Sequence, residues 1–265
     1  MTSTNLVTVT DFDASFKLGK LLGKGGFARV YEGEHRQTKS QVAVKIFFNK
    51  SMDGNMVQNE IQALRCLHHP NIVRLLDLFS DNENTFLCLE KVIGGELFHY
   101  LTRTTSQYNE TTARDLCKII LSAIEHCHCN NVIHRDIKPE NIVMISKLPN
   151  AGIKLIDFGL SIKTTGLVVG RVGTLIYNAP EIWNNNAYGK AVDMWAVGVV
   201  VFLLLWGYHP FAPLDASNIV TARIVREPQW SKVSPEAKDF VSRLLSKNAS
   251  CRLSSSDALE HPWVS

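Results

Sequence analysis

Two short stretches near the middle of the chain carry side chains suited to phosphoryl transfer. The first, His134-Arg135-Asp136-Ile137-Lys138-Pro139-Glu140-Asn141, holds carboxylates, an ammonium group and an amide. The second, Asp157-Phe158-Gly159, follows a strand-like run and adds a further carboxylate. Such a transfer needs a carboxylate near the acceptor hydroxyl, a cation on the moving phosphate and oxygen ligands for magnesium. Asp136, Lys138, and the pair Asn141 with Asp157 could supply these in turn.

A glycine-rich run lies upstream, between two strand-like stretches. It reads Gly23-Lys24-Gly25-Gly26-Phe27-Ala28-Arg29-Val30. Glycines let the backbone approach a polyphosphate closely, so that its amides can contact phosphate oxygens. Because the run connects two strands and opens no helix, it does not fit a dinucleotide-binding fingerprint.

A single lysine ends the next apolar strand. Lys45 closes the run Val42-Ala43-Val44-Lys45, where a charge is unfavourable unless an anion receives it. A phosphate and a carboxylate would both serve, and Glu60, in the helix-like stretch that follows, is the candidate carboxylate. The alternative for Glu60 is a solvated helix face.

Composition describes an ordinary folded protein. A chain of 265 residues allows one domain or two closely packed lobes, and 45% apolar with 20% charged residues is typical of globular proteins. The formal net charge of +3 is spread along the chain and does not favour nucleic acid or a membrane surface. The longest apolar run, Val197 to Leu205, is far shorter than the roughly 18 residues of a membrane span.

Cysteine usage and the N-terminus predict an intracellular, cytoplasmic protein, with nuclear access left open. The first residues carry no secretory signal, and the six cysteines therefore predict free thiols in a reducing compartment. The run His126-Cys127-His128-Cys129 could suggest a metal cluster. Its candidate ligands are adjacent, unlike the spaced ligands of structural zinc sites, so packing at a helix end is the preferred interpretation.

Two patterns of hydrophobic spacing divide the chain into two lobes. Strand-like runs cover 16–23, 28–35, 41–48, 72–79 and 85–90, with one helix-like stretch at 56–67. After a hinge at Lys91 to Gly95, apolar residues three or four apart predict helices over 113–127, 193–206, 218–225 and 235–245. We predict an α+β fold with an N-terminal extension at 1–15, an N-lobe at 16–93 and a C-lobe at 94–265.

Taken together, these residues resemble the protein kinase family, from about Phe16 to Trp263. The resemblance implies a bilobal protein-kinase-like fold, with a small antiparallel β-sheet and one helix in the N-lobe and a larger, mainly helical C-lobe. It implies ATP and Mg²⁺ as cofactors and protein substrates with serine or threonine acceptors. The catalytic set would be Lys45 on the phosphates with Glu60 as its helix partner, Asp136 as catalytic aspartate beside Lys138, and Asn141 and Asp157 as metal ligands.

The same resemblance implies roles for residues further along. Ala179-Pro180-Glu181 would close the activation segment, Arg252 would pair with Glu181, and Asp193 would be the buried aspartate of a core helix. Lys138 and the pair Gly173-Thr174 favour serine or threonine acceptors over tyrosine, and Thr174 would line the substrate groove.

A nucleotide pocket is implied as well. Ala28 replaces the third glycine of the loop, where its methyl group is a small obstacle. Apolar side chains would enclose adenine, the hinge backbone would form hydrogen bonds with it, and the glycine-rich loop would contact the phosphates. The nucleotide-binding residues would be Leu22, Gly23, Gly25, Ala28, Val30, Ala43, Lys45, Glu60, Leu89, Glu90, Val92 and Val143.

Within the family the chain resembles the calcium/calmodulin-dependent group, through Gly94-Gly95-Glu96-Leu97-Phe98 and its final residues. Glu96 and Glu140 would then receive arginines that precede the acceptor, since a carboxylate suits a bidentate arginine. A helix N-terminal acid is the alternative for Glu96. No EF-hand pattern and no basic amphipathic tail is present, so calmodulin is not implied, and the oligomeric state stays open.

Regulation and turnover leave alternatives. A phosphate on Thr164 or Thr165 could pair with Arg135, or both threonines could be ordinary loop residues. An active protein kinase is the preferred function because no catalytic position is missing. A nucleotide-binding pseudokinase scaffold is the alternative, and a small-molecule kinase ranks last.

Overall fold

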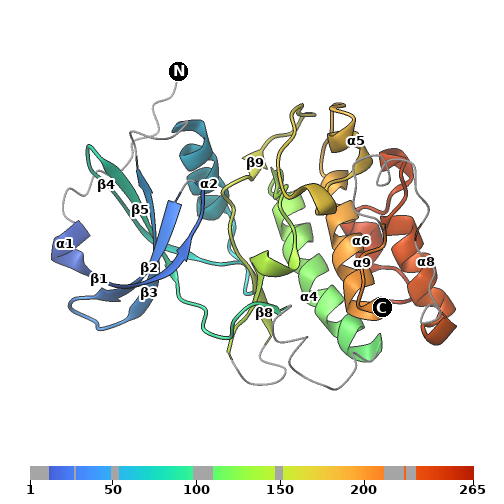
Figure 1. Cartoon of the computed structure of the whole chain (residues 1–265), viewed down its shortest axis with the longest axis horizontal. Coiled ribbons are helices and arrows are strands. Elements are labelled where there is room, and N and C mark those ends of the chain that lie inside the picture. The colour runs from blue at the N-terminus through green and yellow to red at the C-terminus, as the bar shows by residue number, and fades with distance from the viewer. Residues whose placement is uncertain are drawn as a thin grey trace.

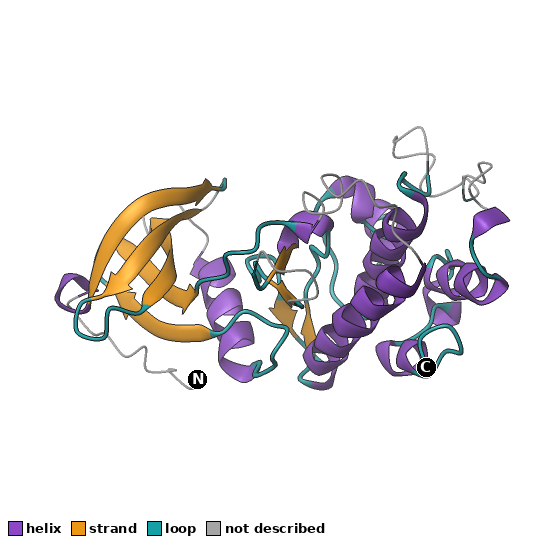
Figure 2. Ribbon diagram, turned by 90° about the horizontal axis from the view of Figure 1, so that it is seen from below, coloured by secondary structure: helices purple, strands orange, loops and turns teal. Residues whose placement is uncertain are grey.

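The computed structural model describes residues 12–26, 28–48, 54–97, 110–146, 152–211, 224 and 231–265. They form two lobes side by side, a sheet with a helix beside it and a larger group of helices (Figure 1). The view turned by 90° shows the large sheet in one lobe, and the long helices with a few short strands in the other (Figure 2). The predicted α+β, bilobal fold is confirmed.

The N-lobe is built on a five-stranded antiparallel sheet in the order β1-β2-β3-β5-β4. Its strands are β1 (Phe16–Lys24), β2 (Ala28–His35), β3 (Gln41–Phe48), β4 (Leu75–Ser80) and β5 (Asn84–Glu90). The central strand β3 is the most apolar and the most buried of them. The strand predicted from Ile72 begins only at Leu75, because Ile72 forms a bridge to Leu155 of the other lobe.

Two helices accompany this sheet among the described residues. α2 (Gly54–Cys66) buries Val57, Ile61 and Leu64 on one face, as the helical spacing predicts, and buries Glu60 with them. The short α1 (Phe12–Ser15) lies at the opposite end of the lobe, where the Phe12 ring stacks on the rings of Phe16 and Phe86.

The C-lobe is organised around one buried helix. α6 (Ala191–Trp206) is apolar on nearly all sides and ends at Gly207, whose φ of +79° suits a glycine cap. Around it lie α4 (Glu110–Cys129), α5 (Pro180–Trp183), α8 (Pro235–Leu244) and α9 (Ser255–Leu259). The helix predicted over 218–225 falls outside the described residues, apart from Ile224. Across the described ranges no helix has the length and apolarity to cross a membrane.

The described part of the C-lobe also contains two short two-stranded ribbons and three 3-10 turns. β6 (Val132–Ile133) pairs with β9 (Ile162–Lys163), and β7 (Ile142–Met144) pairs with β8 (Ile153–Leu155). The turns are η2 (Pro139–Asn141), η3 (Leu175–Tyr177) and η5 (Ala249–Cys251). The two predicted motifs, His134 to Asn141 and Asp157 to Gly159, therefore lie in loops at the ends of these ribbons.

The lobes are joined where the hinge meets β7. The N–H of Gly94 donates to Met144 (3.1 Å), and the N–H of Met144 donates to Gly95 (2.9 Å). A Cβ at Gly94 would overlap the backbone of Met144, so only glycine allows this approach.

Candidate active site

The loop from His134 to Asn141 is held by one buried carboxylate. Asp193 of α6 accepts hydrogen bonds from the N–H groups of His134 and Arg135, both at 2.9 Å. His128 Nε2 of α4 lies 3.0 Å from the same carboxylate. These bonds hold Arg135 at a φ of +66°, which a non-glycine residue seldom adopts. Burial raises the pKa of Asp193, but the hydrogen bond and charge of His128 outweigh it, so the pKa lies below its ordinary value.

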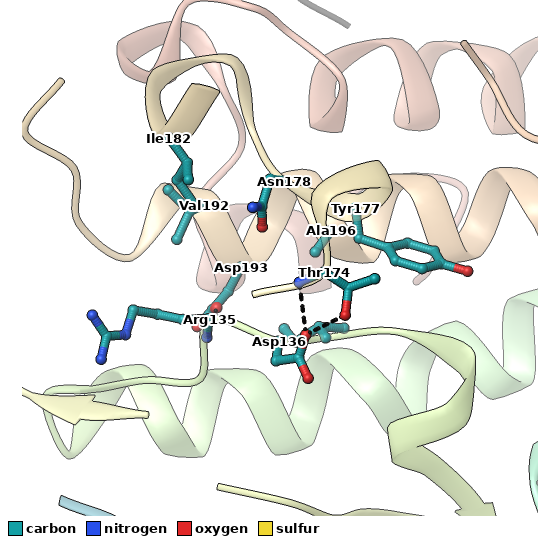
Figure 3. Close-up of a pocket in the computed structure, with 10 residues that line it drawn as sticks. Arg135, Asp136, Thr174, Tyr177, Asn178, Ile182, Val192, Asp193 and Ala196 are labelled. Atoms are coloured by element: carbon teal, nitrogen blue, oxygen red, sulfur yellow. Dashed lines mark hydrogen bonds between the residues drawn. The ribbon is translucent and has the colours of Figure 1, made fainter. Parts of the chain in front are cut away.

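The Asp136 carboxylate is bonded on both oxygens. Oδ1 accepts from the backbone N–H (3.0 Å) and hydroxyl (2.8 Å) of Thr174, as the dashed lines in Figure 3 mark. Oδ2 accepts from Asn141 Nδ2 (3.0 Å) and lies 2.8 Å from Lys138 Nζ. Lys138 Nζ in turn donates to the Thr174 hydroxyl (2.8 Å). Three residues, Thr174, Asn141 and Lys138, thus contact one carboxylate and fix its direction.

Asn141 and Asp157 are the two predicted ligands of a magnesium ion. Asn141 Nδ2 donates to the Asp136 carbonyl (2.8 Å) as well as its carboxylate, so the amide oxygen of Asn141 remains an available acceptor. Asp157 has a φ of +59°, and its Oδ1 accepts from the Gly159 N–H at 3.2 Å. A carboxylate and an amide oxygen suit magnesium, which takes water and phosphate oxygens as its other ligands.

Lys45 lies between two carboxylates. Its Nζ is 2.7 and 2.8 Å from the two Glu60 oxygens and 2.7 Å from Asp157 Oδ1. Burial lowers the pKa of Lys45, but the charges of Glu60 and Asp157 outweigh it and the pKa is raised. The Glu60 side chain is 1% exposed, so it does not lie on a solvated helix face. The pair joins β3 to α2 and orients the lysine toward Asp157.

The phenylalanine after Asp157 packs into the core. Phe158 is fully buried, and its ring lies 4.7 Å from the His134 ring in an edge-on arrangement. His134 Nδ1 accepts from the Asp136 N–H (3.3 Å), and Nε2 lies 3.2 Å from the Ile156 carbonyl. Burial lowers the pKa of His134, which keeps its ring neutral. These contacts join the two sequence motifs into one unit.

The glycine-rich loop leaves open space at its glycines. A Cβ added at Gly23 or Gly26 would meet no neighbouring atom within 4 Å, so packing within the protein does not require glycine there. The Gly25 N–H donates to the Ala28 carbonyl (2.9 Å), which closes a tight turn. Such space is what a phosphate in close contact with the backbone would occupy. The predicted contact of this loop with phosphates stays a prediction.

The chain matches a family model described as "Protein kinase domain" over residues 16–264. The chain belongs to the protein kinase family. It is 39% identical over 97% of its length to "Calcium/calmodulin-dependent protein kinase type II subunit delta" of Oryctolagus cuniculus, and covers 50% of that protein. It is 39% identical over 94% of its length to "Calcium/calmodulin-dependent protein kinase type 1" of Macrobrachium nipponense, covering 74% of it.

A third relative is "Calcium/calmodulin-dependent protein kinase type II alpha chain" of Drosophila melanogaster. It is 37% identical over 96% of this chain, which covers 50% of it. The chain thus spans about half the length of the two type II relatives. The predicted resemblance to the calcium/calmodulin-dependent group is confirmed, and members of the protein kinase family use ATP and magnesium.

The predicted adenine-pocket residues of this kinase come from both lobes. Ala43 on β3 and Leu89 on β5 are neighbours in the sheet register, and Val143 lies on β7 of the C-lobe. Leu22 on β1 is 45% exposed, whereas Val30 on β2 and Val92 in the hinge are half-buried.

Glu90 at the hinge has a contact that the sequence did not indicate. Its carboxylate accepts from Lys154 Nζ (2.7 Å) and from the Arg74 N–H (3.0 Å). Lys154 also donates to the Pro70 carbonyl (2.6 Å). This lysine of β8 therefore links the hinge of the kinase to the loop after α2.

The two candidate substrate carboxylates are exposed. Glu96 lies beside Val143 through an isolated bridge, and Glu140 lies in η2. Burial raises the pKa of Tyr177, and the nearby charge of Glu140 raises it further. Glu140 is thus close to the turn that follows Thr174.

The candidate regulatory residues of the kinase are engaged with other groups. Arg135 donates through Nε to the Leu160 carbonyl (2.7 Å) and through Nη1 to the Tyr188 hydroxyl (3.3 Å). The Thr164 hydroxyl accepts from the Gly166 N–H at 3.0 Å. Within the described ranges, no hydrogen bond joins Arg135 to Thr164 or to the exposed Thr165.

Two residues at the site, Asn178 and Tyr188, were not predicted from the sequence. Asn178 Nδ2 donates to the Val172 carbonyl (2.9 Å), and Asn178 and Asp136 line the same small cavity (Figure 3). Tyr188, described above, also forms an antiparallel bridge with Val168. Tyr188 reaches the site from a distant part of the chain, and Asn178, although it directly precedes Ala179-Pro180-Glu181, belongs to no catalytic motif.

The run His126-Cys127-His128-Cys129 ends α4. His128 is buried, with Nδ1 2.9 Å from the Ser255 hydroxyl and Nε2 on Asp193. Over the described ranges no group of three or more His, Cys, Asp or Glu side chains is arranged to bind a metal ion. The run instead connects α4 and α9 to the loop that carries Asp136.

Proposed function

We propose that this kinase transfers the γ-phosphate of ATP to serine or threonine hydroxyls of protein substrates. The observation that carries the proposal is the contact set of the Asp136 carboxylate, whose oxygens are bonded to Thr174, Asn141 and Lys138. A carboxylate with a fixed direction is suited to orienting an acceptor hydroxyl and taking its proton. Lys138 beside it would offset the negative charge of the moving phosphate.

The remaining roles follow from the donors available. Asn141 and Asp157 would hold magnesium, which when bound supplies positive charge to the phosphate oxygens. Lys45, fixed by Glu60, would donate to phosphate oxygens of ATP, and the backbone of Gly23 and Gly25 would cover them. The hydrophobic residues Leu22, Val30, Ala43, Leu89 and Val143 would enclose adenine, with Glu90 and Val92 bonding it through the backbone.

Recognition of arginine before the acceptor is part of the proposal. Glu96 and Glu140 are exposed carboxylates on the same lobe as Asp136, and Glu140 is near Tyr177 beyond Thr174. Exposed carboxylates beside a groove favour a bidentate guanidinium. We expect substitution of both glutamates by glutamine to raise the KM of an arginine-containing peptide and to leave that of an arginine-free peptide unchanged.

A phosphate on Thr164 or Thr165 is proposed as a switch acting on Arg135. Among the described residues, the guanidinium bonds neutral oxygens, those of Leu160 and Tyr188. A phosphate offers a charge-assisted bond and would compete with the Tyr188 hydroxyl. Thr165, which is exposed, is the more accessible of the two acceptors.

The boundaries of the lobes and the cellular location are also proposed. Lobes at 16–93 and 94–265, preceded by an extension at 1–15, are supported by the Gly94–Met144 junction. A cytoplasmic location is supported by six free cysteines, all within the described ranges.

The proposal is tested with magnesium, labelled ATP and a serine peptide carrying arginine three residues before the acceptor. We expect label on serine with the wild-type protein and a rate about 10²- to 10⁴-fold lower for Asp136→Asn. A protein that binds ATP and transfers nothing, even after Thr164 and Thr165 are phosphorylated, would be the pseudokinase scaffold.

A further inference from the structure

A histidine after α6 contacts the loop that carries Thr174. His209 Nε2 lies 2.9 Å from the Ile176 carbonyl oxygen, so Nε2 carries the proton that this bond needs. His209 Nδ1 lies 3.2 Å from the Phe211 N–H and 3.1 Å from the Phe211 carbonyl. In the neutral ring Nδ1 is an acceptor, so it accepts from the Phe211 N–H. Burial lowers the pKa of His209 and thereby favours the neutral ring.

The contacted carbonyl belongs to the turn η3, which begins directly after Thr174. The Tyr177 N–H donates to the Thr174 carbonyl at 2.9 Å, so the turn is closed on itself. Thr174 is bonded to Asp136 at one end, and His209 binds the Ile176 carbonyl near the other. Two side chains from distant parts of the chain therefore fix the position of η3.

His209 is itself anchored in the core. Phe211 donates its N–H to His209 Nδ1. Phe211 is 1% exposed and stacks on Trp195 of α6, with ring centroids 5.2 Å apart. The Tyr177 ring meets the His209 ring edge-on at 6.2 Å. The histidine therefore links η3 to the buried helix α6. The turn itself lies at the surface, where Leu175 is 54% exposed.

We propose that His209 is a positioning residue that holds η3 in the arrangement on which a peptide substrate lies. The inference rests on the proposed kinase function, because the turn follows Thr174 beside Asp136. Loss of the His209–Ile176 hydrogen bond would leave η3 fixed at one end only, and the peptide would bind a more variable surface. The nucleotide, bound between the lobes, would not sense the change.

Two substitutions separate the hydrogen bond from the packing of the ring. His209→Phe keeps an aromatic ring beside Tyr177 and removes both hydrogen bonds, whereas His209→Gln keeps an N–H donor near the position of Nε2. His68→Phe is the matched control, since His68 is exposed in the N-lobe. The KM for peptide, the KM for ATP and the melting temperature are measured for all four proteins.

We expect His209→Phe to raise the peptide KM about two- to tenfold, the equivalent of one hydrogen bond, with the ATP KM changed by less than about twofold. We expect the peptide KM of His209→Gln to lie close to that of the wild-type protein, because the glutamine keeps the N–H donor. An unchanged peptide KM in His209→Phe, or equal increases in both KM values, would overturn the role of His209. Absence of transfer by the wild-type protein would instead refute the proposed function, so the two failures are distinguishable.

Discussion

Two charged side chains of the site, Lys45 and Asp193, are buried beside partners of opposite charge or beside hydrogen-bond donors. Lys45 has Glu60 and Asp157, and Asp193 has His128 and two backbone N–H groups. A buried charge without a partner is strongly unfavourable, so each partner contributes to stability as well as to orientation. Removal of a single partner should therefore be measurable in unfolding.

Glu60→Gln tests the buried pair. Among the described residues, the change leaves Lys45 with Asp157 as its one charged partner, and we expect the free energy of unfolding to fall by about 1–3 kcal/mol. Urea denaturation measures it. Glu34→Gln is the control, because the Lys39–Glu34 pair is exposed, and we expect a change within about 0.5 kcal/mol there. Equal effects of the two changes would contradict the account.

Asp193→Asn tests the pH dependence. Because the pKa of Asp193 is lowered in the folded protein, its contribution is present above the ordinary aspartate pKa of about 3.9 and is lost as the pH falls through the folded value. We expect the variant to be about 1–3 kcal/mol less stable near neutral pH, with the difference shrinking below about pH 4. Denaturation at a series of pH values checks this, and a difference independent of pH would contradict it.

At the scale of elements, the segment from Asp157 to Glu181 passes the Asp136 loop at very short range. Gly173 has a φ of +87°, and a Cβ there would overlap the Arg135 carbonyl and lie 2.8 Å from Asn178 Oδ1. The approach of these two backbones places Thr174 against Asp136. Glycine is required at this position by both conformation and space.

Gly173→Ala should displace Thr174. We expect a loss of about 1–3 kcal/mol in stability from the strained φ, together with a fall in kcat of about tenfold or more, since Asp136 loses a fixed partner. Gly166→Ala is the control in the same segment, because an added Cβ there meets only the Thr164 hydroxyl, at 3.9 Å. A kcat of Gly173→Ala equal to that of the control would refute the role of the close approach.

The sequence predicted these elements where the pattern is local. The helical spacing of Val57, Ile61 and Leu64 was enough to predict α2, and the apolar run at Val197 was enough to predict a buried helix. The strand predicted from Ile72 was placed too early, because Ile72 pairs with the other lobe. Pairing across lobes depends on tertiary packing, which a local pattern does not carry.

The candidate site divides in the same way. Residue type and spacing were enough to predict the motifs that contain Asp136, Asn141 and Asp157. His209 and Tyr188 reach the site through folding, from loops with no chemical pattern, so only the structure brings them into view.

At the scale of the whole molecule, one buried ion pair joins the end of the activation segment to the last part of the C-lobe. Arg252 Nη1 and Nη2 lie 2.7 and 3.1 Å from the oxygens of Glu181, and Arg252 also donates to the carbonyls of Ala191 and Ser246. The guanidinium packs over the Trp195 ring at 5.2 Å. Segments far apart in sequence are thus stabilised by one side chain.

Arg252→Met is expected to lower the free energy of unfolding by about 3–5 kcal/mol, because it leaves the Glu181 carboxylate buried without its partner. Arg243→Met is the control, because it removes an exposed i,i+4 pair with Asp239 on α8. We expect it to change the free energy of unfolding by about 0.5 kcal/mol or less. Urea denaturation of both variants compares them. Similar losses in the two would contradict the assigned importance of the buried pair.

The most direct test of kinase activity is a single-turnover experiment with the protein in excess over γ-labelled ATP and saturating serine peptide. We predict that label appears on the serine hydroxyl within one turnover, and that EDTA or Asp136→Asn abolishes it on the same time scale. ATP that stays intact, or label that passes only to water while the peptide remains unmodified, would contradict the account.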